Sequence, residues 1–130
     1  RKSLELRPAQ PQVLNYLGYM LIEKRENLDE ALDMIELAVE KSPQSGYIID
    51  SLAWGLYQLG RYEEAITPME QAISLEPEDP IVNDHFGDVL WKVGRKREAY
   101  FQWKRVLLFQ PSEELRMDIE KKLKHGLEDL

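Results

Sequence analysis

The apolar residues of the segment 46–77 recur at intervals of three and four, in two successive blocks. The first block places Ile49, Leu52, Ala53, Leu56 and Leu59 on one helical face. Gly60 follows it, and a glycine in the left-handed conformation is a common end of a helix. The second block, about 62–75, carries Ala65, Ile66, Met69, Ala72, Ile73 and Leu75. The pattern predicts two helices joined by a tight turn.

The same arrangement returns 34 residues later. The matching pairs are Gly60 and Gly94, Arg61 and Arg95, Ala65 and Ala99, and Pro77 and Pro111. A self-match at this period predicts stacked helix–turn–helix units, which we place at 11–45, 46–79 and 80–113. The turn "EKREN" of the first unit holds one extra residue and no glycine. We therefore expect Asn27 to adopt the turn conformation and to cap the next helix with its side chain.

The two ends of the chain predict two further elements. The segment "KSLELRP" matches "QAISLEP", so residues 1–10 are interpreted as the tail helix of a truncated preceding repeat. Ser112 is a suitable N-cap for a C-terminal capping helix within 112–130. Its apolar stripe is Leu115, Ile119, Leu123 and Leu127. Its charged residues, Lys122 among them, are expected on the polar outer face that a terminal repeat needs.

The positions shared by the units resemble the signature of the tetratricopeptide repeat (TPR). In the second unit they are Leu52, Ala53, Leu56, Gly60, Tyr62, Ala65, Ala72 and Pro77, and the other two units match at Gly18, Leu21, Ala31, Gly87, Leu90, Gly94 and Ala99. The resemblance covers nearly the whole chain. It implies an all-α fold, an α-solenoid of antiparallel helix pairs in a right-handed superhelix with a C-terminal capping helix.

A second resemblance concerns the stretches "YIIDSLAWGLYQLGRYEEA" and "HFGDVLWKVGRKREAYFQW". They are similar to the C-terminal repeats of large exported TPR proteins of Gram-negative bacteria, some of which are outer-membrane lipoproteins. This resemblance implies a periplasmic or outer-membrane-associated location, with the cytoplasm as the alternative.

In the TPR family the first helix of each unit lines a concave face. The resemblance places ten residues in a partner-binding groove, namely Asn15, Tyr19, Tyr47, Asp50, Trp54, Tyr57, Asp84, His85, Asp88 and Trp91. They combine aromatic rings with carboxylates, so we expect a protein or peptide partner carrying Lys or Arg with apolar residues. The alternative is that Trp54 and Trp91 are buried between repeats. The family's clamp for acidic chaperone tails needs Lys, Asn and Arg in the groove, and the sequence lacks it, because the corresponding positions are Asn15, Tyr19, Ser51, Ile81 and His85.

Composition narrows the functional classes. The net charge of −7 argues against a nucleic-acid partner and against an anionic membrane surface. The absence of cysteine excludes disulfides and thiolate metal sites.

An enzymatic alternative centres on Asp84, His85 and Asp88, which lie within about one helical turn and could bind a metal ion. No second histidine is near, so we expect His85 to be an exposed groove residue. The sequence thus predicts a non-enzymatic scaffold or adapter without cofactor or metal. Self-association through the array ends is the remaining alternative.

Overall fold

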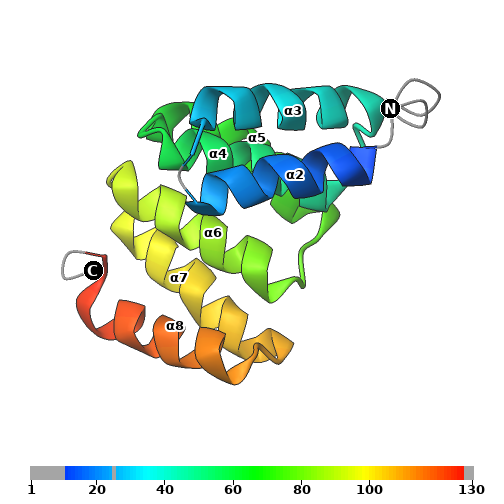
Figure 1. Cartoon of the computed structure of the whole chain (residues 1–130). Helices are drawn as coiled ribbons and strands as arrows, with labels where there is room; N and C mark the ends of the chain where they lie inside the picture. The colour runs from blue at the N-terminus through cyan, green and yellow to red at the C-terminus, as the bar shows by residue number, and fades with distance from the viewer. Residues whose placement is uncertain (1–10, 25, 128–130) are drawn as a thin grey trace, which may run out of the picture.

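The computed structural model describes residues 11–24 and 26–127. The predicted tail helix over 1–10 lies outside the described residues. The described helices are α2 (Pro11–Lys24), α3 (Leu28–Lys41), α4 (Gly46–Gln58), α5 (Tyr62–Leu75), α6 (Pro80–Lys92), α7 (Lys96–Val106), the 3₁₀ turn η1 (Leu107–Phe109) and α8 (Glu113–His125). No strand occurs in this part of the chain. The predicted all-α solenoid is confirmed (Figure 1).

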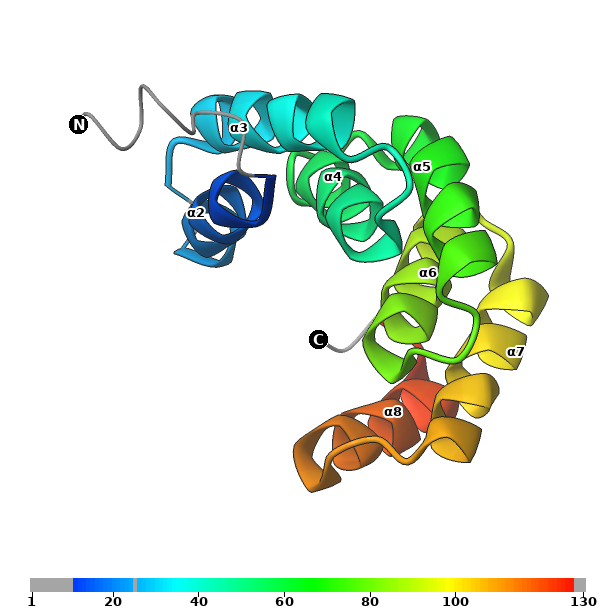
Figure 2. The ribbon, with the colours of Figure 1, turned by 90° about the vertical axis from the view of Figure 1, so that its right-hand side faces the viewer.

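Consecutive helices form three antiparallel pairs, α2 with α3, α4 with α5 and α6 with α7. Viewed end-on, the pairs follow an arc in which α2, α4 and α6 form the inner layer and α3, α5 and α7 the outer layer (Figure 2). Helix α8 packs on α7 at the end of the arc. The first helix of each pair therefore lies on the concave side, as expected.

Small residues allow the two helices of a pair to approach closely. Ala53, Ala65 and Ala72 are fully buried in the second pair. In the third pair a methyl group at Gly87 would overlap the indole ring of Trp103. The main core runs from Leu32 through the second and third pairs to Ile119 of α8, so the capping helix shares one apolar core with the repeats.

The turns show why the fixed glycines recur. Gly60 and Gly94 have φ of +79° and +90°. The amides of Gly60 and Arg61 donate to the carbonyls of Tyr57 and Leu56, which is the hydrogen-bond pattern of a Schellman motif. The first turn uses Asn27 at φ 47°, as predicted, but its side chain makes no capping hydrogen bond. The expectation of a side-chain cap at Asn27 was therefore wrong, because only its backbone conformation is used.

Candidate functional site

The centre of the concave face is a column of stacked rings that ends on an ion pair. Tyr57 stacks on Trp54 with centroids 4.5 Å apart, and Trp54 stacks on His85 at 3.9 Å. The Nδ1 of His85 donates to both carboxylate oxygens of Asp50, at 2.9 and 3.1 Å. Because Asp50 and Trp54 belong to α4 and His85 to α6, the column joins two adjacent repeats.

A second charged cluster joins α6 to the capping helix. The Nζ of Lys122 donates to Asp84 Oδ1 at 2.8 Å and to Asp88 Oδ1 at 3.0 Å. Asp88 also accepts from the indole Nε1 of Trp103 at 3.1 Å. Lys122 is only 5% exposed, so its expected place on the charged outer face of α8 was wrong. It projects inward beside Ile119 and neutralises the two carboxylates.

Burial and charge act against each other in these clusters. Burial alone lowers the pKa of His85, but the Asp50 carboxylate, helped by Asp84 and Asp88, outweighs it and raises that pKa above the usual histidine value. Burial and the neighbouring Asp84 raise the pKa of Asp88 to about 7, although Lys122 opposes this. Burial lowers the pKa of Lys122, but Asp88 and Asp84 raise it to a net value above that of free lysine.

The α2 side of the concave face is more open. Tyr19 and Trp54 are both half-buried. Burial raises the pKa of Tyr19, and the carboxylates of Glu23, Asp50 and Asp84 raise it further, so this phenol lies in a negative field. Two polar atoms, Asn15 Oδ1 and Trp54 Nε1, are buried without a hydrogen-bond partner. The structure thus brings aromatic surface, polar groups and negative charge together between α2 and α4.

Two of the ten predicted groove residues lie apart from this cluster. Tyr47 is exposed at the start of α4 and lines a depression of about 370 Å³ with the turn 76–80. Trp91 is half-buried against Tyr100 and Trp103, in space that the absence of a side chain at Gly126 leaves open. The predicted alternative was burial between repeats: Trp54 packs on His85 of the next repeat, whereas the rings of Tyr100 and Trp103 that Trp91 contacts belong to its own repeat, and both tryptophans stay half-buried.

The expectation that His85 is exposed was wrong, since its exposed fraction is 6%. Its Nδ1 faces Asp50, while Asp84 and Asp88 hold the ammonium of Lys122. Within residues 11–24 and 26–127, no group of three His, Cys, Asp or Glu side chains converges in a way that could hold a metal ion. The geometry offers the metal-dependent alternative no support.

Sequence reasoning missed Lys122 and the indole of Trp103 as members of the concave charge cluster. The signal for Lys122 was present in helical spacing, because residues 115, 119 and 122 share one face. The contact of Trp103 with Asp88 had no such signal, because the two residues lie on different helices of a pair.

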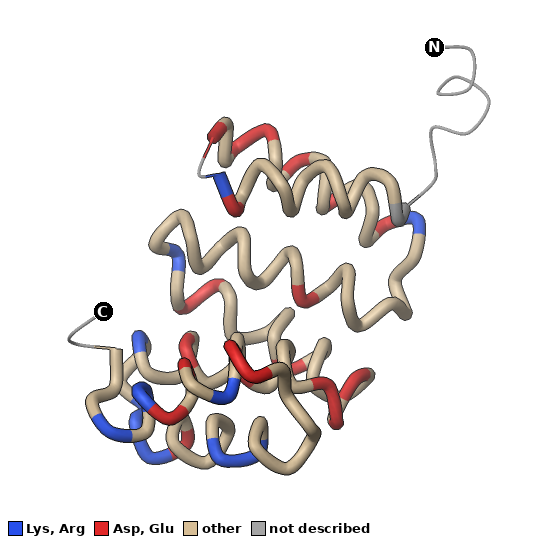
Figure 3. The backbone as a smooth tube through the Cα atoms, turned by 60° about the horizontal axis from the view of Figure 1, so that its bottom comes forward, with Lys and Arg blue, Asp and Glu red and all other residues tan. Residues whose placement is uncertain are grey.

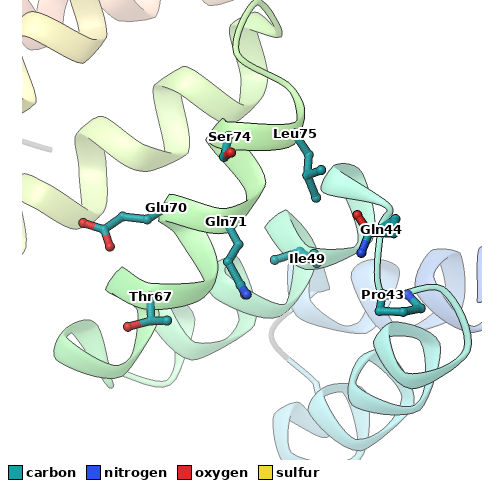
Figure 4. Close-up of a pocket in the computed structure, with 8 residues that line it drawn as sticks. All are labelled: Pro43, Gln44, Ile49, Thr67, Glu70, Gln71, Ser74 and Leu75. Carbon is teal, nitrogen blue, oxygen red and sulfur yellow. The ribbon is translucent and has the colours of Figure 1, made fainter.

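Away from the concave face, α5 and the turn between α3 and α4 border a depression of about 390 Å³ (Figure 4). It is lined by Pro43, Gln44, Ile49, Thr67, Glu70, Gln71, Ser74 and Leu75. Glu70 is its one ionisable side chain, so it holds no acid–base or nucleophile pair. Among the helices described, none is both long and apolar enough to cross a membrane.

An arc of antiparallel helix pairs with an aromatic and charged inner face is the architecture of a helical-repeat protein. Residues 47–75 match the family model described as "Tetratricopeptide repeat". This match covers the second of the three predicted units and supports the tetratricopeptide repeat resemblance that the sequence pattern predicted. No match was found among curated proteins. The resemblance to exported bacterial TPR proteins, and the location that it implies, stay predictions.

Solved TPR structures share this fold. The first TPR domain of human RPAP3 superposes with a TM-score of 0.78 at 19% identity, covering 94% of this chain and 95% of that one. The first TPR of Spaghetti (RPAP3) bound to the HSP90 peptide SRMEEVD gives a TM-score of 0.77 at 19% identity, covering 91% and 93%. The P58(IPK) TPR domain gives 0.79 at 24% identity, covering 91% of this chain and 33% of that one. At these identities the likeness establishes the fold alone.

Proposed function

We propose that the chain is a non-enzymatic scaffold that holds a peptide or protein segment on the concave face between α2 and α4. The observation that carries this is the half-buried aromatic surface of Tyr19 on α2 and Trp54 on α4, with Tyr19 in the negative field of Glu23, Asp50 and Asp84. The unpartnered atoms Asn15 Oδ1 and Trp54 Nε1 are buried, so a bound segment reaches them only after neighbouring side chains move. Aromatic surface with polar tips is typical of recognition sites.

The α6 part of the concave face is a weaker candidate for the contact. Asp84 and Asp88 share the ammonium of Lys122, and Asp50 holds His85. An incoming cation would have to displace buried internal partners, which leaves charges uncompensated. We therefore assign partner contact to the α2–α4 side and internal stabilisation to the α6–α8 side.

We expect the partner to carry Lys or Arg because the concave face keeps a net negative charge near Tyr19. The buried charges nearly cancel, but exposed Glu23 adds negative charge next to Tyr19. A cation stacked on Tyr19 gains from both the ring and the Glu23 carboxylate. The TPR of Spaghetti (RPAP3) was solved with the acidic peptide SRMEEVD, and an acidic peptide of this kind should be repelled here.

The test compares two heptapeptides by isothermal titration calorimetry, SRMEEVD and a basic–apolar peptide built from Lys, Arg, Leu and Tyr. We expect the basic peptide alone to bind, and less tightly as salt rises, because exposed charges are screened within about 8–10 Å at physiological ionic strength. Tyr19→Ala and Glu23→Gln should each weaken it roughly five- to tenfold, as expected for loss of about 1 kcal/mol of contact energy.

Tyr47→Ala is the matched control, because Tyr47 is an exposed tyrosine outside the α2–α4 face. Equal binding of both peptides, or no effect of Tyr19→Ala, would contradict the proposed site. Abolition of binding by a chelator would instead favour the metal-dependent alternative at Asp84, His85 and Asp88.

A further inference from the structure

One face of α2 exposes a stripe of large apolar side chains. Val13, Tyr16, Leu17 and Met20 are 44%, 64%, 45% and 38% exposed. Their spacing of three and four places them on one side of the helix. Single exposed apolar residues need no explanation, but a contiguous stripe on a helix marks an interaction surface.

The repeat register shows what this stripe corresponds to. One unit later the same positions are Ile48, Ser51, Leu52 and Gly55 of α4, and two units later they are Val82, His85, Phe86 and Val89 of α6. All of these except the half-buried Leu52 are buried in the array. A methyl group at Gly55 would lie 3.0 Å from Ile22 and 3.1 Å from Leu32, both of the preceding unit. The stripe on α2 is thus a repeat–repeat interface that no described residue covers.

The charge pattern of α2 suits contact with a second copy of this chain. Residues 11–22 include no charged side chain, and α2 carries charge only at Glu23 and Lys24, at its C-terminal end (Figure 3). Two copies with a net charge of −7 repel one another over most of their surface. An uncharged apolar face is where such repulsion is smallest and where apolar burial is available.

The opposite end of the array differs in chemistry. The exposed residues of α8 are Glu113, Glu114, Met117, Glu120, Lys121, Lys124 and His125. With one apolar member among seven, this face does not complement the stripe on α2. Head-to-tail stacking of copies, which would extend into a filament, is therefore disfavoured. A self-complementary contact between two copies of the same face instead gives a closed dimer.

We propose that two copies of the chain pair through the α2 stripe in a closed, two-fold dimer. The interface is Val13, Tyr16, Leu17 and Met20 of each copy, packed against the same four residues of the other copy. The stripe shares no residue with the proposed partner contact at Tyr19 and Glu23, so variants of the two sites can be tested separately.

The test measures the mass of the full chain by sedimentation equilibrium across a hundredfold range of concentration. We expect twice the chain mass at the upper end. The double variant Leu17→Lys with Met20→Glu should stay monomeric, with an unchanged circular dichroism spectrum. Leu108→Lys alters a leucine of η1 that is 72% exposed and lies outside the stripe, and it should leave the dimer intact.

A second measurement uses the natural absence of cysteine. Tyr16→Cys lies in the proposed interface of both copies and should cross-link the dimer with a short bismaleimide, whereas Leu108→Cys should not. A wild-type monomer at every concentration would overturn the proposal, and protection of a Leu17→Cys thiol in that monomer would assign the stripe to a segment of the same chain. Assemblies larger than a dimer would also overturn it, since they require an open contact.

Discussion

The ammonium of Lys122 lies 2.8 Å from Asp84 and 3.0 Å from Asp88, so the last helix supplies the cation for two buried carboxylates of α6. These residues are 34 and 38 positions apart in the chain. A buried ion pair adds little net stability compared with an apolar contact, but removal of one partner leaves an uncompensated charge. The contact therefore makes the docking of α8 depend on Lys122.

We predict that Lys122→Met destabilises the chain by about 3 kcal/mol at pH 8, because Asp84 and Asp88 lose their shared cation. The loss should be smaller at pH 6, where Asp88 takes up a proton in the absence of the ammonium. Urea unfolding at the two pH values measures both. Lys124→Met is the control, since Lys124 is an exposed lysine of the same helix. Equal effects of the two substitutions would contradict the role of Lys122.

Stability should fall as the pH rises from about 5 to 8. Asp88 has a pKa of about 7 in the fold and near 3.9 in the unfolded chain, so the folded state binds more protons between these values. The pKa of His85 is also raised, so its contribution is complete below about 6.5 and is lost above that, as the pH rises through the folded pKa. Both groups therefore act in the same direction. Thermal unfolding followed by circular dichroism should give a higher Tm at pH 5.5 than at pH 8.

Two variants separate these contributions. Asp88→Asn should flatten the pH dependence below 7, and His85→Gln should flatten it above about 6.5. A Tm that rises between pH 5.5 and 8 in the wild type would show that these two groups do not dominate the linkage.

Gly87 and Gly60 should respond differently to alanine. A methyl group at Gly87 meets the ring of Trp103 in a close-packed interior, and overpacking there costs roughly 1–3 kcal/mol. At Gly60 nothing lies within 4 Å of the added carbon, so the loss of about 1 kcal/mol comes only from the positive φ. The near-ultraviolet circular dichroism of Trp103 should change for Gly87→Ala and not for Gly60→Ala. The reverse pattern would mean that the packing face of α6 is misassigned.

Asn27→Gly should leave the stability unchanged or raise it slightly. The residue has φ 47° and its side chain makes no capping hydrogen bond, so the backbone conformation is what the turn requires. Asn27→Ala should instead cost about 1 kcal/mol, because alanine adopts that conformation with strain. Urea denaturation of both variants checks this. If Asn27→Gly lowers the stability as much as Asn27→Ala does, the side chain of Asn27 caps the helix after all.

The positions of the helices, the turns at Gly60 and Gly94 and the capping residue Ser112 were predictable from sequence. Each depends on interactions within a few residues, such as apolar spacing, a positive φ, or the hydroxyl of Ser112 accepting from the amide of Leu115 at 3.1 Å. The repeat period also predicted which helices pair, because units with small residues at the same positions pack in the same way.

The state of the concave residues was not predictable in this way. Asp84, His85 and Asp88 were correctly placed on the first helix of their unit, yet whether they meet solvent or another side chain depends on residues 34 to 38 positions away. Helical periodicity determines which side chains share a face, but it does not determine how far one helix is rotated and advanced against the next. The sequence by itself therefore determined the array of helix pairs and which helices line its inner face. Only the tertiary packing decided that His85 and Lys122 pair with the carboxylates of that face, and that the α2 side stays open.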